Sequence, residues 1–145
     1  MNNSELEKKI NSIVRELVDK QGFISSTDVL IELGYLSQAD YENWRKGKIE
    51  YLEKTCQVNL GKLTTINRIL RQESKKMKLE PSWTDYNKYG KGPKMRLRFS
   101  NSGEENIEKA YSTHYVNKYR INQLNELKRN PVPDENKNHQ QVTSL

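Results

Sequence analysis

Apolar side chains recur at helical spacing through the first 20 residues. Leucine, isoleucine and valine occupy positions 6, 10, 13, 14, 17 and 18, which form a stripe along one face of a helix. Ser4 and Glu7 have the spacing of a capping box, in which each side chain bonds a backbone N–H at the start of a helix. Gly22 follows the last apolar position and favours a stop. The pattern therefore predicts an amphipathic helix over 4–20.

Three shorter helical segments are predicted next. The first runs between Ser25 and Gly34 and the second between Ser37 and Gly47, because each serine is a good N-cap and each glycine a good stop. Apolar residues then recur at helical spacing over 48–57. All three segments are short, so we expect tertiary packing rather than local propensity to stabilise them.

A stronger helix is predicted over 62–79. Its apolar residues form one stripe, and Arg68, Arg71, Lys75 and Lys78 follow helical spacing on nearly the opposite side. A proline two residues beyond this helix ends it. The segment is therefore expected to bury one face and to present a basic face to solvent.

The next stretch alternates between basic and apolar side chains. Positions 94, 96 and 98 are basic, whereas Met95, Leu97 and Phe99 are apolar. Successive side chains of a β-strand point to opposite faces, so a strand here has a basic face and an apolar face. The glycines at 90–93 predict a turn before it, and we expect a β-hairpin at about 83–99, with Trp83 and Phe99 as its core anchors.

The rest of the chain divides into a helix and a tail. Ser102 and Glu105 favour a helix that begins near 104 and runs to about 128. Residues 130–145 contain prolines and many amides but few apolar residues, which is typical of disorder. The predicted fold is mainly α with one β-hairpin (α+β), as a single domain over 1–129 with a disordered tail over 130–145.

A winged helix-turn-helix fold is an alternative architecture for the same elements. In that fold a recognition helix enters the major groove of DNA and the hairpin is the wing. The helix between Ser37 and Gly47 would be the recognition helix, but its Asp40 and Glu42 would repel phosphates. A further long helix also separates this helix from the hairpin, whereas a standard wing follows directly.

The positive charge is concentrated in the middle of the chain. Residues 1–56 contain 8 Lys/Arg and 10 Asp/Glu, residues 57–100 contain 11 and 3, and residues 101–145 contain 6 and 6. A segregated excess creates a directional field that suits a polyanion, and phosphates are bound by clustered lysine and arginine. The predicted nucleic-acid-binding residues are Arg68, Arg71, Lys75, Lys88, Tyr89, Lys91, Lys94, Arg96 and Arg98. The alternative is a solvated or protein-facing basic surface.

A second cluster of aromatic and basic residues lies near the middle of the first half. Trp44, Arg45 and Tyr51 are residue types that anchor protein interfaces, so they are a candidate partner-binding patch. The alternative is structural: Trp44 is buried, and Arg45 pairs with Glu42 or Glu53.

Candidate chemistry for catalysis is weak. Cys56 lies in an apolar pattern without a histidine nearby in the sequence, which is typical of a core residue. His114 is expected to pack on a helix, and His139 lies in the tail. Two histidines and one cysteine do not build the usual zinc sites. We therefore expect a protein that is not an enzyme and has no metal or other cofactor.

Composition places the protein among soluble chains. Hydrophobic residues make up only 33%, and no apolar run approaches the roughly 20 residues that cross a bilayer. The N-terminus lacks the apolar segment of a signal peptide. These features predict a cytoplasmic protein without a membrane partner.

Four short motifs resemble a group of small uncharacterised bacterial proteins. They are Trp44-Arg45-x-Gly47, Tyr51-Leu52-Glu53, Pro81-Ser82-Trp83-Thr84 and Leu97-Arg98-Phe99-Ser100, and the resemblance covers about 22–116. It implies a bacterial origin and a single domain, and it brings no activity. From the residues we expect non-catalytic binding of DNA or RNA through the basic helix face and the hairpin, with a regulatory role as one use. The alternative is a protein-interaction module or adaptor with an acidic protein partner.

Overall fold

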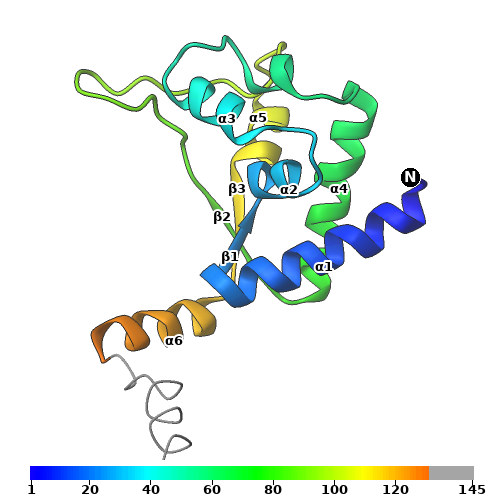
Figure 1. Ribbon diagram of the computed structural model, residues 1–145, viewed down its shortest axis with the longest axis vertical. Coiled ribbons are helices and arrows are strands. Elements are labelled where there is room, and N and C mark those ends of the chain that lie inside the picture. Colours follow the sequence, from blue (N-terminus) through cyan, green and yellow to red (C-terminus); the bar gives the residue numbers. More distant parts are fainter. Residues whose placement is uncertain (131–145) are drawn as a thin grey trace, which may run out of the picture.

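The molecule is built of helices around a small sheet (Figure 1). The computed structural model describes residues 1–130. The helices are α1 (Asn3–Gln21), α2 (Ser26–Glu32), α3 (Gln38–Arg45), α4 (Leu60–Lys76), α5 (Glu105–Ser112) and α6 (Lys118–Arg129), with a 3₁₀ turn, η1, at Leu52–Thr55. The strands are β1 (Phe23–Ser25), β2 (Glu80–Trp83) and β3 (Thr113–Val116). The predicted class, mainly α within α+β, is confirmed, and the predicted disordered tail lies outside the described residues.

The two long predicted helices form with slightly different starts. Asn2 rather than Ser4 caps α1, because its side chain accepts a hydrogen bond of 2.9 Å from the backbone N–H of Glu5. Asn59 caps α4 in the same way by accepting from Lys62 N–H at 2.8 Å, so Gly61 lies inside the first turn of this helix. The apolar stripes of both helices are buried in one core.

The sheet has the order β1-β3-β2, and both pairings are antiparallel. Ile24 of β1 is opposite Tyr115, and Trp83 at the end of β2 is opposite Thr113. The central strand therefore comes last in the chain. β3 pairs on one side with β1, from the N-terminal quarter of the chain, and on the other side with β2, which ends 30 residues before β3 begins.

The prediction of one helix from about 104 to 128 is wrong. The chain leaves α5 at Ser112, forms β3 and begins α6 only after Asn117, whose side chain accepts from Arg120 N–H at 2.9 Å. Threonine, tyrosine and valine in β3 favour a pleated conformation. Pairing on both sides of β3 outweighs the helical pattern that surrounds it.

The predicted hairpin forms in part and projects from the body as an arm, defined here as residues 84–99 (Figure 1). Leu97 N–H donates to the Tyr86 carbonyl at 2.7 Å, and Lys88 N–H donates to the Met95 carbonyl at 2.8 Å. Trp83, however, pairs with β3 and not with the far side of the hairpin. Its side chain is 50% exposed, so the prediction that it is a core anchor is wrong.

The predicted helical segment at 48–57 is reduced to the turn η1. Leu52 N–H donates to the Arg98 carbonyl at 3.2 Å, and Glu53 N–H donates to the Phe99 carbonyl at 2.9 Å. These backbone donors are therefore used across the chain and are not free for a regular helix.

An aromatic cluster joins α3, the root of the arm and α5. Trp44 is fully buried, and its ring lies 4.8 Å from Phe99 and 5.6 Å from Tyr86, measured between centroids. Phe99 in turn stacks on Tyr111 at 5.3 Å. Phe99 is thus the core anchor that the alternating pattern predicted, and this cluster fixes the root of the arm relative to α5.

Candidate functional site

The residues predicted to bind nucleic acid fall into two separate sets. Arg68, Arg71 and Lys75 lie on α4, whereas the other six lie on the arm. In Figure 1 the arm extends to the upper left and α4 lies on the right, so the fold does not bring the two sets together. The two sets have different surroundings.

Contacts of Arg45 hold the arm against the end of α3. The Arg45 guanidinium lies 5.0 Å from the ring centre of Tyr86 and 4.3 Å from that of Tyr89, and it donates to the Asn87 carbonyl at 3.2 Å. The Tyr89 N–H donates to the Arg45 carbonyl at 2.7 Å. Gly47 lies directly against the side chain of Lys88, so the loop after α3 runs beside the arm.

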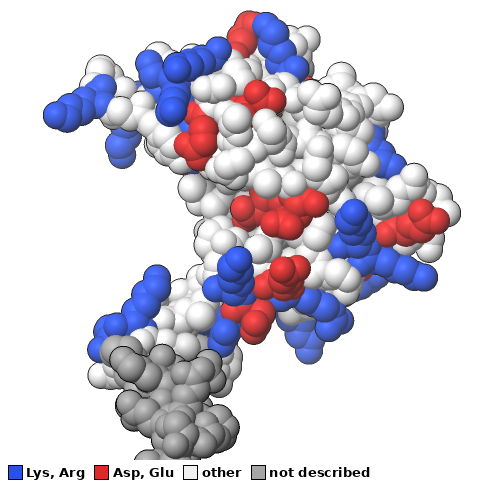
Figure 2. Space-filling model, viewed as in Figure 1, with Lys and Arg blue, Asp and Glu red and all other residues white. Residues whose placement is uncertain are grey.

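Cations crowd this part of the surface (Figure 2, upper left). We call the set the arm surface; its members share exposure to solvent and a place on the arm or on the adjoining loop, and they are Lys46, Lys48, Lys88, Lys91, Lys94 and Arg96. The acid on the arm, Asp85, forms an ion pair with Arg96 at 3.3 Å. Lys46 and Lys48 were not among the predicted binding residues, because contacts between residues far apart in the sequence, such as that of Gly47 with Lys88, bring their loop to the arm.

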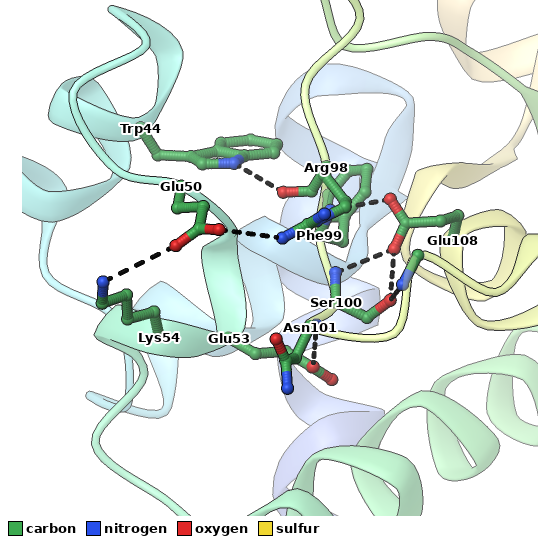
Figure 3. A network of polar contacts seen from close by, with 10 residues as sticks. Trp44, Glu50, Glu53, Lys54, Arg98, Phe99, Ser100, Asn101 and Glu108 are labelled. Carbon is green, nitrogen blue, oxygen red and sulfur yellow. Dashed lines mark hydrogen bonds and ion pairs between the residues drawn. The ribbon is translucent and has the colours of Figure 1, made fainter.

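Arg98, also predicted as a binding residue, is engaged within the fold (Figure 3). Its guanidinium pairs with Glu50 at 3.5 Å and lies over the Tyr51 ring at 5.5 Å. Its backbone carbonyl accepts from the Trp44 indole N–H at 2.9 Å. We therefore leave Arg98 out of the arm surface.

The basic residues of α4 line a groove between α4 and α5. The groove has a volume of about 1150 Å³. Its lining includes the apolar side chains Leu79, Pro81, Ile107 and Ala110, and Tyr115. Arg71 and Tyr115 both belong to this lining; burial raises the pKa of Tyr115, and the positive charge of Arg71 opposes this rise.

Five cations border the groove, and we call them the groove rim: Arg68, Arg71, Lys75, Lys78 and Lys109. The acid in the lining, Glu53, accepts from the Tyr111 hydroxyl at 2.7 Å and from the Asn101 N–H at 3.2 Å. Within residues 1–130 no acid forms an ion pair with a member of the rim. The rim is therefore a local excess of positive charge around an apolar lining.

Lys109 on α5 was missed by the sequence reasoning. Its contribution depends on α5 lying across from α4, which is a long-range contact that spacing does not reveal. One signal was present: Ile107 and Ala110 are apolar but lie off the buried face of α5, which contains Glu108, Tyr111 and Ser112. Apolar residues on a second helix face indicate a second surface.

A buried carboxylate holds the wall of the groove and the root of the arm in one arrangement (Figure 3). Glu108 of α5 accepts from Phe99 N–H at 2.8 Å, from Ser100 N–H at 2.8 Å and from the Ser100 hydroxyl at 2.6 Å. Charge-assisted bonds of this kind are stronger than neutral ones. Both candidate surfaces are thus built on the same rigid joint.

The predicted partner patch is not continuous. Trp44 has no exposed surface, which agrees with the structural alternative. Arg45 bonds the Tyr41 hydroxyl at 3.1 Å and the Asn87 carbonyl, and not Glu42 or Glu53. Tyr51 lies under Arg98. These side chains make contacts within the fold, so they are not part of the proposed sites.

The titratable candidates are both shielded. Burial, with help from the Glu53 charge, raises the pKa of the Cys56 thiol to about 12, so the thiol is protonated at neutral pH. Burial lowers the pKa of His114, which lies in β3 and not on a helix, and its Nε2 is 2.8 Å from the Tyr86 hydroxyl.

Among residues 1–130, none of the helices combines the length and the apolar composition that a membrane-spanning segment requires.

In comparisons with known proteins, no family model, no curated protein and no solved structure matches the chain. The resemblance to a group of small bacterial proteins therefore stays a prediction.

Proposed function

We propose that the protein binds nucleic acid without catalysis and that the arm surface makes the contact. The observation that carries the proposal is the gathering of six exposed cations, four on the projecting arm and two on the adjoining loop, where the acid of the arm, Asp85, is already paired with Arg96. Lysine and arginine that fan out from a convex surface reach successive phosphates. Such contacts position a nucleic acid without reading its bases.

The connectivity supports the same proposal. The order α1-β1-α2-α4-β2-β3 with the sheet order β1-β3-β2 resembles that of a winged helix, in which α3, η1 and α5 would be additions. In that arrangement the wing is the connection between β2 and β3, and this connection contains the arm. In this interpretation α4 takes the position of the recognition helix, whereas the sequence pattern assigns that position to the helix between Ser37 and Gly47. The basic residues of α4 border the groove, and apolar side chains lie beside them there. We therefore assign the nucleic-acid contact to the arm and not to α4.

One aromatic ring is placed to add to these phosphate contacts. Tyr89 lies near the tip of the arm and is 45% exposed, although one face of its ring is covered by Arg45. A free ring face can stack on a base of a single strand. We therefore expect single-stranded nucleic acid to bind at least as tightly as a duplex of equal charge.

The test is the salt dependence of binding, measured by fluorescence anisotropy with labelled 20-nucleotide single-stranded DNA, duplex DNA and RNA. With about five phosphate contacts, affinity for duplex DNA should fall by about 10²- to 10³-fold between 50 and 200 mM salt. The double variant Lys91→Glu/Lys94→Glu should lose most of the binding at 50 mM. Lys8→Glu/Lys9→Glu, the same charge change at two exposed lysines of α1, is the matched control and should retain most of it. Equal losses in the two variants would contradict the assignment to the arm.

A further inference from the structure

The groove between α4 and α5 differs from a phosphate-binding surface because much of the surface inside its basic rim is apolar. Leu60 at the start of α4 is 60% exposed, and Ile107 on α5 is 37% exposed; both belong to the lining. Apolar surface that remains in water is unfavourable and favours a partner that covers it. Contacts to phosphate alone would leave these two side chains in water.

The positive charge of the groove rim favours a partner that carries negative charge. All five rim cations lack an ion pair within residues 1–130, and Glu53 is occupied by Tyr111 and Asn101. An occupant with acidic side chains at its edges and aliphatic side chains at its centre is complementary to both features. A basic or uniformly polar occupant matches neither.

The exposure of its tyrosines, its volume and its length make the groove better suited to a peptide helix than to a nucleic acid or a small molecule. Single-strand sites stack bases on open aromatic faces, but the tyrosines of the groove, Tyr111 and Tyr115, are only 2% and 8% exposed. A cavity of about 1150 Å³ exceeds the usual range of about 300–1,000 Å³ for small-molecule sites. Leu60 and Lys75 are 15 residues apart on α4, which corresponds to about 22 Å along the helix. A partner helix of about 15 residues spans that length.

We propose that the groove between α4 and α5 binds an acidic amphipathic helix of a partner protein. Aliphatic side chains at i, i+3, i+4 and i+7 of that helix cover Leu60 and Ile107, and its Asp and Glu side chains face Arg68, Arg71 and Lys109. The site is preformed, because Glu108 fixes α5 through three hydrogen bonds. With the arm surface on nucleic acid, the protein would join an acidic protein to a nucleic acid.

The test uses three labelled 16-residue synthetic peptides in fluorescence anisotropy. The first is an amphipathic helix with an aliphatic stripe and Asp/Glu elsewhere, the second is its scrambled sequence, and the third has Lys in place of every acid. We expect saturable binding of the first and at least 10-fold weaker binding of the other two. Absent binding of the first peptide, or equal binding of its scrambled form, would overturn the proposal.

Variants locate the binding. Ile107→Glu should weaken the acidic helix at least 10-fold, whereas Leu127→Glu, the same change at an exposed leucine of α6, should leave it within 2-fold. Arg68→Glu/Arg71→Glu should weaken it at least 10-fold, whereas Lys91→Glu/Lys94→Glu should change it less than 3-fold. If the arm variant is the more damaging, the groove is not the site. Circular dichroism and thermal melts of each variant establish that it is folded.

A separate readout distinguishes this inference from the proposed nucleic-acid binding. The single-stranded DNA probe is titrated into the Ile107→Glu variant under the conditions used for the peptide. Unchanged DNA affinity with lost peptide binding supports two sites, even if the DNA affinity itself is low. Loss of DNA binding in Ile107→Glu would overturn the proposal, because the groove would then be the nucleic-acid site.

Discussion

The arm surface and the groove rim contain nearly the same number of cations but surround them with different neighbours. The arm projects from the body, and its lysines stand beside glycines, a proline and the half-exposed Tyr89. The rim borders a concave lining that includes Leu60 and Ile107. Charge on a convex element is suited to a flexible polyanion, whereas charge around an apolar groove is suited to an amphipathic partner.

A charge count along the chain therefore does not identify a binding surface. The +8 excess of residues 57–100 appears continuous in the sequence. The fold divides it, because β2 ends at Trp83 and the arm leaves the body there, away from α4. What each half can bind depends on which apolar groups lie beside it.

The largest effect is expected from Trp44→Ala, which removes the support that both surfaces share. Loss of a fully buried tryptophan from a core costs about 3–5 kcal/mol of unfolding free energy. The carbonyl of Arg98 also loses its indole donor. Chemical denaturation should show this loss, with nucleic-acid and peptide binding both weakened. A variant that keeps one of the two activities intact would show that the surfaces have separate supports.

Glu108→Gln is expected to have the next largest effect. Phe99 N–H and Ser100 N–H donate to different oxygens of the carboxylate, and an NH2 group replaces one of these oxygens in glutamine, so one buried donor loses its partner. We expect a cost of about 2 kcal/mol. Binding of the acidic peptide should be weakened more than binding of DNA, because Glu108 fixes the position of α5, and α5 forms a wall of the groove. Glu104→Gln, an exposed change at the cap of the same helix, is the control and should cost less than about 0.5 kcal/mol in urea denaturation.

Gly47→Ala should disturb the arm and spare the groove. Gly47 has φ = 79°, a left-handed conformation that costs a residue with a side chain about 1–2 kcal/mol. A Cβ there would also lie 2.9 Å from Cε of Lys88, which must move. Thermal melts should show a modest loss of stability, and DNA affinity should fall while peptide affinity holds. Gly34→Ala has a similar backbone conformation with open space around it, so it should lower stability without changing DNA affinity.

The smallest effect is a pH dependence at the root of the arm. Burial lowers the pKa of His114 below its ordinary value of 6.5, against an opposing influence of the Asp28 charge. Neutral His114 stacks on Phe23 and lies beside the Tyr86 hydroxyl. Its stabilising contribution is complete above pH 6.5 and is lost as the pH falls through the lowered folded-state pKa, because the unfolded chain takes up the proton more readily.

The comparison for this effect is His114→Gln, which keeps a hydrogen-bonding side chain but does not titrate. Urea denaturation at pH 7 and pH 5 should show a smaller decline in stability for this variant than for the wild-type protein. An equal decline in both proteins would remove His114 as the cause.

The elements that local spacing specifies were predictable from the sequence. The stripes of α1 and α4, the helices around α2 and α3 and the burial of Phe99 follow from periodicity and turn residues. The strands β1 and β3 were missed, because segments of three and four residues have little pattern of their own. Their stability comes from pairing between segments about 90 residues apart.

The candidate sites were predictable only as residue types. The lysines of the arm were predicted together because they are neighbours in the sequence. The groove was not predicted, because it requires α4 and α5 to face each other, and that arrangement depends on buried contacts of Glu108 and Tyr111. Ile107 and Lys109 acquire meaning only after that packing is known.

The most direct test of the account is a crossed binding measurement. Single-stranded DNA and the acidic amphipathic peptide are each titrated, at 50 mM salt, into the wild-type protein, Lys91→Glu/Lys94→Glu and Arg68→Glu/Arg71→Glu. Both variants change the charge by the same amount, so total charge is matched. We expect the arm variant to lose at least 10-fold in DNA affinity and less than 3-fold in peptide affinity, and the groove variant to show the reverse. Equal losses for both probes in both variants would show that only total charge matters and would contradict two distinct surfaces.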